Sequence, residues 1–282
     1  MTGLSFGSGP EAPQWRRRGG RLLIYAALLA TAVVMLYPFW SMGITSFRSL
    51  TQYYAGSGFS LASWHELFQS LPVLRELLNS TILTVGGIAV IVAVSSTAGY
   101  AFGVLHYRFS GVIFLVVISA MMVPMQSMII PEFVNLARLG FVNHLYGAIL
   151  VYAALGAPFA TFLMTTYLRR LPEELIEAAL IDGLGYGRIF IRIMLPLALP
   201  AIFVIAVLQF IQIWDDLLVG LLFLQTPAQR PITVGLATIP SQHLLNVPVL
   251  MAGSLISAVP AIVVYLIFQR HLITGLTMGI AK

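Results

Sequence analysis

One polar stretch interrupts this apolar chain and reads Glu173-Glu174-Leu175-Ile176-Glu177-Ala178-Ala179-Leu180-Ile181-Asp182-Gly183. Nine residues follow before Ile193-Met194-Leu195-Pro196. Acidic residues, then good helix formers, then a glycine predict a short helix that ends in a sharp turn. Pro172 suits the first turn of that helix, because its missing N–H costs nothing there, and Gly183 can adopt a positive φ. The stretch therefore predicts a compact knob between apolar segments.

The composition on either side of this stretch is that of a membrane protein. Of the 282 residues, 59% are hydrophobic and 9% are charged, whereas a soluble domain carries roughly 25% charged residues. The absence of cysteine excludes disulfides and thiolate metal sites. The net charge of +5 comes mostly from basic residues that flank apolar runs. It therefore indicates orientation in a membrane and no nucleic-acid partner.

Six apolar runs are each close to the ~20 residues that a helix needs to cross ~30 Å of hydrocarbon. They cover residues 22–47, 77–104, 112–131, 145–168, 198–222 and 249–269. No alternating pattern typical of barrel strands occurs, so we predict an all-α integral membrane protein with six transmembrane helices. Residues 1–21 are expected to be a tail with little fixed structure, and residues 22–282 one transmembrane domain with its core at about 75–270.

Small residues and prolines predict how some of these helices pack and bend. Ser95, Gly99 and Gly103 recur at four-residue spacing, which lets helix backbones approach closely in a membrane. Pro124 and Pro131 are expected to kink or end the third span, because proline lacks the N–H that a helix interior needs.

The distribution of basic residues predicts the orientation of the spans. Cytoplasmic segments of membrane proteins carry an excess of Lys and Arg. With the N-terminus inside, eleven basic residues lie in inner segments and four in outer ones. The four outer residues are Arg48, Arg75, Arg138 and Arg230. Both termini are therefore expected in the cytoplasm, and so is the loop formed by residues 171–196.

The spelling Glu-Ala-Ala, three residues, Gly, nine residues, Ile-x-Leu-Pro closely resembles the cytoplasmic loop of permeases from ATP-binding cassette (ABC) importers. Other segments are similar to carbohydrate-type members of that family. These segments are Leu36-Tyr37-Pro38-Phe39, Ala98-Gly99-Tyr100-Ala101-Phe102, Leu139-Gly140-Phe141 and the ending Gly275-Leu276-Thr277-Met278-Gly279-Ile280-Ala281-Lys282. The ending resembles that of the smaller permease subunit of maltose importers. The resemblance covers about residues 22–282.

This resemblance implies a type I importer permease fold in a bacterial or archaeal inner membrane. It also implies three partners: a second, homologous permease that completes a heterodimer, an ATPase dimer and an extracytoplasmic solute-binding protein. The loop would dock onto the ATPase through Glu174, Glu177, Ala178, Ala179, Asp182 and Gly183.

The chain itself carries no signature of ATP hydrolysis. A Gly-rich phosphate-binding loop needs an internal Lys followed by Ser or Thr, and the only lysine here is the last residue, Lys282. We therefore expect a non-catalytic subunit without a cofactor of its own, with ATP and Mg²⁺ bound by the partner ATPase. No metal site is expected either, because none of the five histidines has a second histidine four residues away.

The fifth span contains a polar group that predicts a substrate path. Gln209, Gln212, Asp216 and Gly220 would fall on one face of a continuous helix, given ~100° per residue. Trp214 and Asp215 belong to the same cluster, in which aromatic rings and amides suit stacking on sugars and hydrogen bonds to hydroxyls. Related permeases commonly show Trp-Asn followed by an acidic residue here. Asp215 departs from that pattern.

The predicted function is the transport of a sugar or sugar-like solute into the cytoplasm, and alternatives remain at this stage. The solute could be of another kind, such as a glycerol phosphate. A stand-alone secondary transporter would want an ionisable residue at mid-membrane, and the spans offer only the Asp pair near one end. Trp214 could merely mark the membrane interface. An intramembrane enzyme would need a catalytic motif, and adjacent Asp215 and Asp216 point ~100° apart, a poor start for paired acid–base chemistry.

Overall fold

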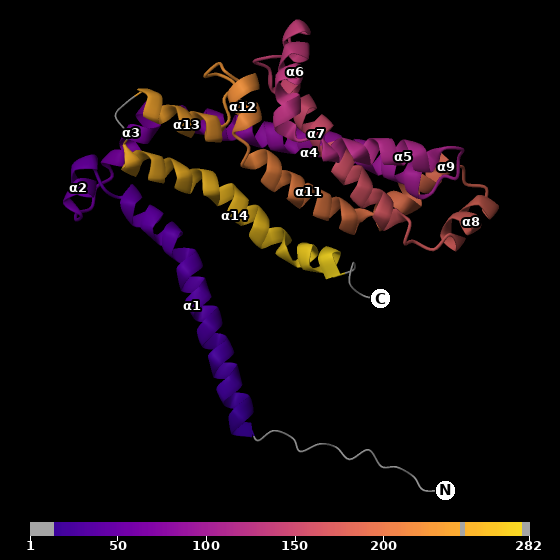
Figure 1. Cartoon of the computed structure of the whole chain (residues 1–282), viewed down its shortest axis with the longest axis horizontal. Helices are drawn as coiled ribbons and strands as arrows, with labels where there is room; N and C mark the ends of the chain where they lie inside the picture. The colour runs from indigo at the N-terminus through magenta and orange to yellow at the C-terminus, as the bar shows by residue number, and fades with distance from the viewer. Residues whose placement is uncertain (1–13, 243–245, 278–282) are drawn as a thin grey trace.

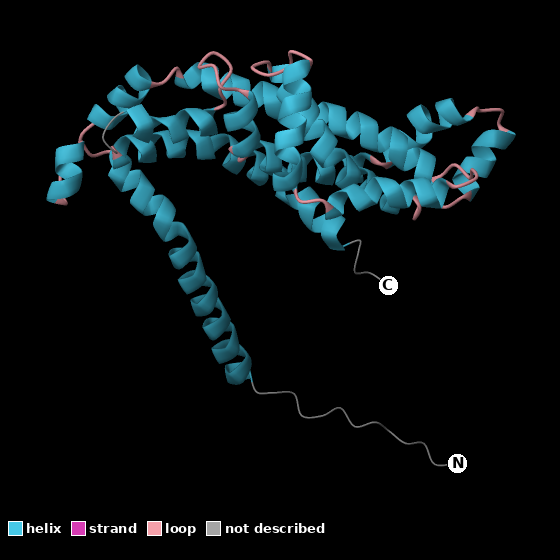
Figure 2. Cartoon of the chain, turned by 45° about the horizontal axis from the view of Figure 1, so that its top comes forward, coloured by secondary structure: helices cyan, strands magenta, loops and turns pink. Residues whose placement is uncertain are grey.

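The computed structural model describes residues 14–242 and 246–277. Within these ranges the chain forms helices and turns and no strand. Figures 1 and 2 show an elongated bundle with α8 (Glu174–Ile181) at one end, and with α2 (Leu50–Ala55), α3 (Ala62–Ser70) and α13 (Ile232–Gln242) at the other. Most of the predicted tail and the last residues of the family-like ending lie outside the described residues. The all-α prediction is confirmed.

Four helices are long and apolar enough to cross a membrane unbroken. They are α1 (Gln14–Ser46), α4 (Val73–Gly103), α7 (Leu145–Leu168) and α14 (Val247–Thr277). Helix α1 begins at Gln14, before the first predicted span, so part of the predicted tail is helical. It leaves the bundle as a separate arm (Figure 1), contacts α14 and buries none of its apolar window within this chain.

The third and fifth predicted spans are broken helices. α5 (Ser110–Ser119) and a 3₁₀ turn (Ala120–Met122) meet α6 (Met125–Arg138) at an angle of 100°. Pro124 stands at this break as the residue directly before α6, so the third span is broken there as predicted. Pro131 lies inside α6, so of the two outcomes expected, a kink or an end, it does not end the span. The count of six spans holds when each bent helix pair is taken as one span.

The fifth span starts at the end of the polar loop. α9 (Tyr186–Ile189), a π-helical turn (Phe190–Met194) and α10 (Leu195–Leu197) lead to α11 (Leu199–Trp214) through a bend of 69°. α11 stops at Trp214, and α12 (Leu218–Phe223) follows as a separate short helix. The prediction of one continuous helix over 198–222 is therefore wrong, because the backbone leaves the helix between the two segments.

Helices α4 and α7 form the tightly packed centre of the bundle. A Cβ at Gly99 would collide with Cγ of Met164 and would lie 3.2 Å from the backbone nitrogen of Thr165. A Cβ at Gly103 would lie 3.3 Å from the backbone oxygen of Thr165. These approaches confirm the role predicted for small residues at four-residue spacing, because any larger side chain would separate the two helices.

The end of the bundle opposite α8 is tied together by polar side chains of α4. The Asn79 amide donates hydrogen bonds to the backbone oxygens of Ala228 and Arg230, at 3.1 and 2.9 Å. The hydroxyl of Ser80 accepts a 2.9 Å hydrogen bond from the backbone N–H of Ile232. These contacts fix the start of α13 against α4.

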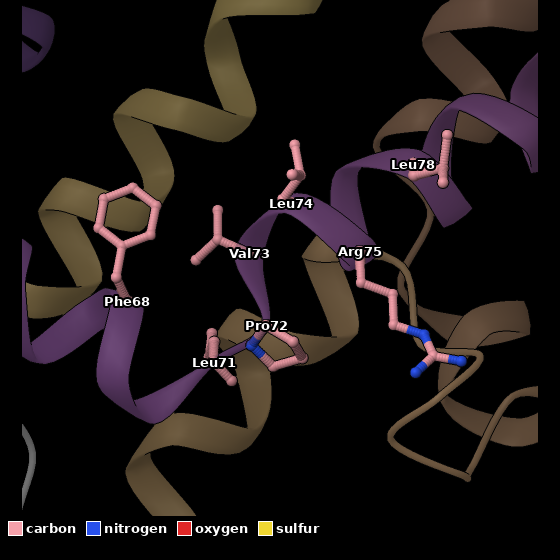
Figure 3. Close-up of a pocket in the computed structure, with 7 residues that line it drawn as sticks. All are labelled: Phe68, Leu71, Pro72, Val73, Leu74, Arg75 and Leu78. Atoms are coloured by element: carbon pink, nitrogen blue, oxygen red, sulfur yellow. The ribbon is translucent and has the colours of Figure 1, made fainter.

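A shallow hollow lies at the turn between α3 and α4, and Figure 3 shows its seven lining residues. Six of them are apolar, and the side chain of Arg75 extends away from the others. A solute with many hydroxyls needs several hydrogen-bonding groups, so this hollow is not the place to look for a polar ligand.

Candidate functional site

The polar loop folds as the predicted knob. α8 begins at Glu174 and has Asp182 as its C-terminal cap, so Pro172 lies before the helix and not in its first turn. Gly183 follows with φ of +81°. Its N–H bonds the oxygen of Leu180, and the N–H of Leu184 bonds the oxygen of Ala179, both at 3.0 Å. These paired bonds form a Schellman motif, which explains why a glycine closes this helix.

One side of α8 faces outward and the other packs on the bundle. Of the residues predicted to couple to an ATPase, Glu174, Glu177, Ala178, Asp182 and Gly183 are exposed. Ala179 is only 4% exposed and belongs to the main apolar core. The two alanines therefore differ: Ala178 permits close approach from outside, whereas Ala179 permits close packing inside.

Sequence reasoning missed the most exposed apolar side chain of the knob. Ile181 is 85% exposed at the last helical position of α8. This side chain therefore presents an apolar group on the outward face of the knob, beside the exposed Asp182. The sequence shows an isoleucine directly before Asp182, but only the fold shows that the side chain of Ile181 is exposed.

Hydrogen bonds hold the segment that follows the knob to the central helices and join the ends of α4 and α7. The Tyr100 hydroxyl on α4 donates to the backbone oxygen of Tyr186 at 3.1 Å. The Tyr167 hydroxyl on α7 donates to the backbone oxygen of Leu197, also at 3.1 Å. The Arg169 guanidinium donates to the oxygen of Phe102 at 3.0 Å. The tyrosine bonds fix the segment that follows the knob against α4 and α7.

A cavity of about 500 Å³ lies between the first bent span, α7 and α11. Its apolar lining includes the methionines Met121, Met125 and Met128, and the ring of Phe159. Its polar lining comes from α6, α7, α11 and the turn after α11. It consists of Glu132, Tyr152, Gln209, Gln212 and Asp216. Mostly apolar walls with a few convergent polar groups are typical of small-molecule sites.

Two of the polar groups are fixed by their neighbours. Oδ2 of Asp216 accepts a 3.0 Å hydrogen bond from the Tyr152 hydroxyl and a 2.8 Å hydrogen bond from the N–H of Val219. The second of these bonds satisfies a free N–H in the first turn of α12. Gln209 is 6% exposed. Its Oε1 lies 2.6 Å from the place that a Cβ at Gly156 would occupy, so this glycine makes room for the amide.

The five residues predicted for the substrate path divide into two groups. Gln209, Gln212 and Asp216 line the cavity. Trp214 does not: it is 3% exposed, and its Nε1 donates a 3.0 Å hydrogen bond to the oxygen of Ser257 on α14. Asp215 is exposed and lies outside the cavity lining.

The helical-face argument behind that prediction was partly wrong. α11 ends at Trp214, so Asp216 and Gly220 do not continue the face of Gln209 and Gln212. Asp216 reaches the cavity because the chain turns there, and Gly220 packs against Val234 and Pro231 instead. Sequence reasoning also missed Tyr152 and Glu132, which lie on other helices and share no sequence pattern with α11.

Comparison with known proteins agrees with this architecture. The family described as binding-protein-dependent transport system inner membrane component matches residues 95–277. The osmoprotective compounds uptake permease protein GgtD of Synechocystis sp. is 29% identical, over 93% of this chain and 92% of its own length. The arabinooligosaccharides transport system permease protein AraQ of Halalkalibacterium halodurans is 34% identical, over 72% of each chain.

A solved structure shows the same fold. It belongs to a bacterial ABC transporter involved in the import of the acidic polysaccharide alginate, with a TM-score of 0.78 and 24% identity, covering 93% of this chain and 99% of that one. The family match covers well over half of the chain and includes both the knob and the cavity wall formed by α11. The chain therefore belongs to the family of binding-protein-dependent transport system inner membrane components.

Proposed function

We propose that this chain is a permease subunit of an ABC importer that moves a sugar or sugar-like solute into the cytoplasm. The observation that carries the proposal is that one bundle holds an exposed knob at one end and a polar cavity farther along. Between them, tyrosine hydrogen bonds from α4 and α7 hold the segment that leads from the knob to α11. Such an arrangement suits alternating access, in which rigid elements move around a fixed site.

The knob would be the contact with a separate ATPase. Its exposed face combines carboxylates, Glu174 and Glu177, with the bare side chain of Ile181. An apolar anchor surrounded by charged groups is the usual anatomy of a protein interface. ATP and Mg²⁺ would be bound by the ATPase dimer, and this chain would perform no covalent chemistry.

The other partners follow from the open sides of the bundle. The apolar arm α1 and the open side of the cavity would face lipid and a second permease subunit. A solute-binding protein would deliver the solute at the end formed by α2, α3 and α13. Both termini and the knob would then lie in the cytoplasm, as the distribution of basic residues predicts.

A sugar suits the chemistry of the cavity. The amides of Gln209 and Gln212 can donate and accept hydrogen bonds, and the Phe159 ring offers an apolar face on which a pyranose can stack. The name of AraQ, a permease for arabinooligosaccharides, supports a sugar for this chain too. The name of GgtD supports a second candidate, an osmoprotective compound. The relatives leave the charge of the solute open, because the importer of known structure carries an acidic polysaccharide.

Reconstitution of the complete importer in proteoliposomes tests the proposal. Uptake should require the ATPase, the binding protein and ATP inside the vesicle. Uptake by this chain alone, driven by an ion gradient, would favour a secondary transporter. Single cysteines can report orientation, because the chain has no native cysteine. Leu180→Cys should react only from the cytoplasmic side and Arg230→Cys only from the outside, and the reverse pattern at either position would overturn the topology.

A further inference from the structure

The cavity walls carry negative charge without a positive counterpart. Two carboxylates line the cavity, Glu132 from α6 and Asp216 from the turn after α11. Among the described residues that line it, none is Lys, Arg or His. An anionic solute in the cavity would therefore meet two like charges and, among these lining residues of this chain, no cation that could compensate for its lost hydration.

Two side chains in this cavity are left for a ligand to satisfy. The Gln209 amide is 6% exposed, lines the cavity, and has no hydrogen-bond partner within the described parts of the chain. Because this amide lines the cavity and is not among the fully buried unpartnered groups, it is free to hydrogen-bond a ligand or water there. The half-buried Glu132 carboxylate likewise receives no hydrogen bond from a described residue, whereas Oδ2 of Asp216 already accepts two.

The geometry points to an uncharged, hydroxyl-rich solute, with Glu132 as the residue of this chain that rejects anionic sugars. This inference rests on the proposed path through the cavity. The free oxygens of Glu132 can accept two hydrogen bonds from sugar hydroxyls, and Gln209 can both donate and accept. A carboxylate that accepts hydroxyl protons discriminates strongly, because an acidic sugar would replace a hydrogen bond with repulsion between two anions.

Charge-selective labelling tests the inference without knowledge of the solute. Met128 lines the cavity one helical turn before Glu132 on α6. In the complete complex carrying Met128→Cys, a cationic trimethylammonium-ethyl methanethiosulfonate should react faster than the anionic sulfonato-ethyl reagent. The ratio of the two rates should fall about tenfold when Glu132→Gln is added, because one unit charge near the sulfur is removed. Glu173→Gln removes the same charge outside the cavity and should leave the ratio unchanged.

The outcomes separate the charge inference from the proposed function. Equal rates for the two reagents, or a ratio that Glu132→Gln does not change, would overturn the role of Glu132. Calorimetry on the solute-binding protein that co-purifies with the complex gives the second readout. Tighter binding of arabinotriose or diacetylchitobiose than of trigalacturonate supports an uncharged solute, and the opposite order overturns it. If the binding protein binds none of these sugars while Glu132→Gln still lowers the ratio of the two labelling rates, that result would contradict the sugar assignment and would support the negative charge at Glu132.

Discussion

The knob and the cavity are built in opposite ways. The knob uses consecutive residues, and its shape depends on local bonds such as the Schellman pair around Gly183. The cavity collects Glu132, Tyr152 and Gln209 from three helices that are distant in sequence. Most side chains on the knob are exposed, whereas the side chain of Gln209 is only 6% exposed.

This difference predicts how substitutions will behave. A change in the knob alters one surface or one turn, and the transmembrane helices should fold as before. A change in the cavity alters groups that neighbours from other helices also contact, so its effect depends on those neighbours. Substitutions in the two regions should therefore differ in their signature: lost contact with the ATPase in the first case, and lost uptake with intact ATPase binding in the second.

The largest effect is expected at Gly183. Its φ of +81° strains a β-branched residue by about 1–3 kcal/mol, although a Cβ there would meet nothing within 4 Å. Gly183→Val should therefore abolish solute-stimulated ATP hydrolysis while the chain still inserts. Gly183→Asn is the matched control, because asparagine tolerates this conformation and should retain most activity. Equal loss in both variants would mean that the side chain and not the backbone matters.

A smaller effect is expected at the exposed apolar tip. Burial of Ile181 in a cleft of the ATPase would contribute about 2 kcal/mol, so Ile181→Ser should raise the Kd for the ATPase roughly thirtyfold. Ile181→Val keeps an apolar side chain and should cost much less. Glu177→Lys, which reverses a charge on the same exposed face, should also weaken the complex. Titration of solubilised permease with the ATPase measures all three, and an unchanged Kd for Ile181→Ser would remove this side chain from the interface.

Within the cavity, Gln212→Ala and Asp216→Asn should each lower uptake about tenfold, as expected for the loss of ~1.4 kcal/mol in hydrogen bonding and charge. ATPase retention should stay normal in both. Asp215→Asn is the control: Asp215 adjoins Asp216 in sequence but lies outside the cavity lining, so its uptake should match that of the unmodified chain. Impaired uptake in the control alone would move the path to the other side of α11.

A few-fold effect is expected at Gly156. An added Cβ would lie 2.6 Å from Oε1 of Gln209, so Gly156→Ala should displace this amide and raise the KM for uptake. The displacement works through Gln209, and the double variant Gly156→Ala/Gln209→Ala should therefore transport no worse than Gln209→Ala alone. If the losses of the two single variants add in the double variant, Gly156 acts through Ile91 instead. Cδ1 of Ile91 lies 2.7 Å from the place that the added Cβ would occupy.

The smallest effect on transport is expected at Trp214. Trp214→Phe removes the hydrogen bond to Ser257 and keeps a ring near Phe210, on which the indole stacks at 5.4 Å between centroids. The change should lower the thermal stability of the complex by about 1 kcal/mol, without altering which solute is transported. A changed solute preference would return Trp214 to the substrate path.

Several features of the fold could be predicted from residues alone. The span at 145–168 coincides with α7, because an uninterrupted apolar run in a membrane can satisfy its backbone only as a helix. The small-residue spacing correctly identified a close helix contact at Gly99. At Pro124 the sequence indicated a disturbance but not a bend of 100°. At Asp215 the sequence predicted a continuous helix, and only the structure shows that α11 stops and α12 restarts.

The sequence by itself determined the membrane class, the number of spans and the position of the knob, because these depend on composition and on short local patterns. Only the tertiary structure decided which polar groups meet. Asp216 reaches the cavity because α11 ends before it and the Asp216 side chain then bonds the first turn of α12. The indole of Trp214, two residues earlier, instead donates a hydrogen bond to the backbone oxygen of Ser257 on α14. Helical periodicity assigns faces only while the helix continues, so the composition of a cavity between broken helices depends on how those helices pack.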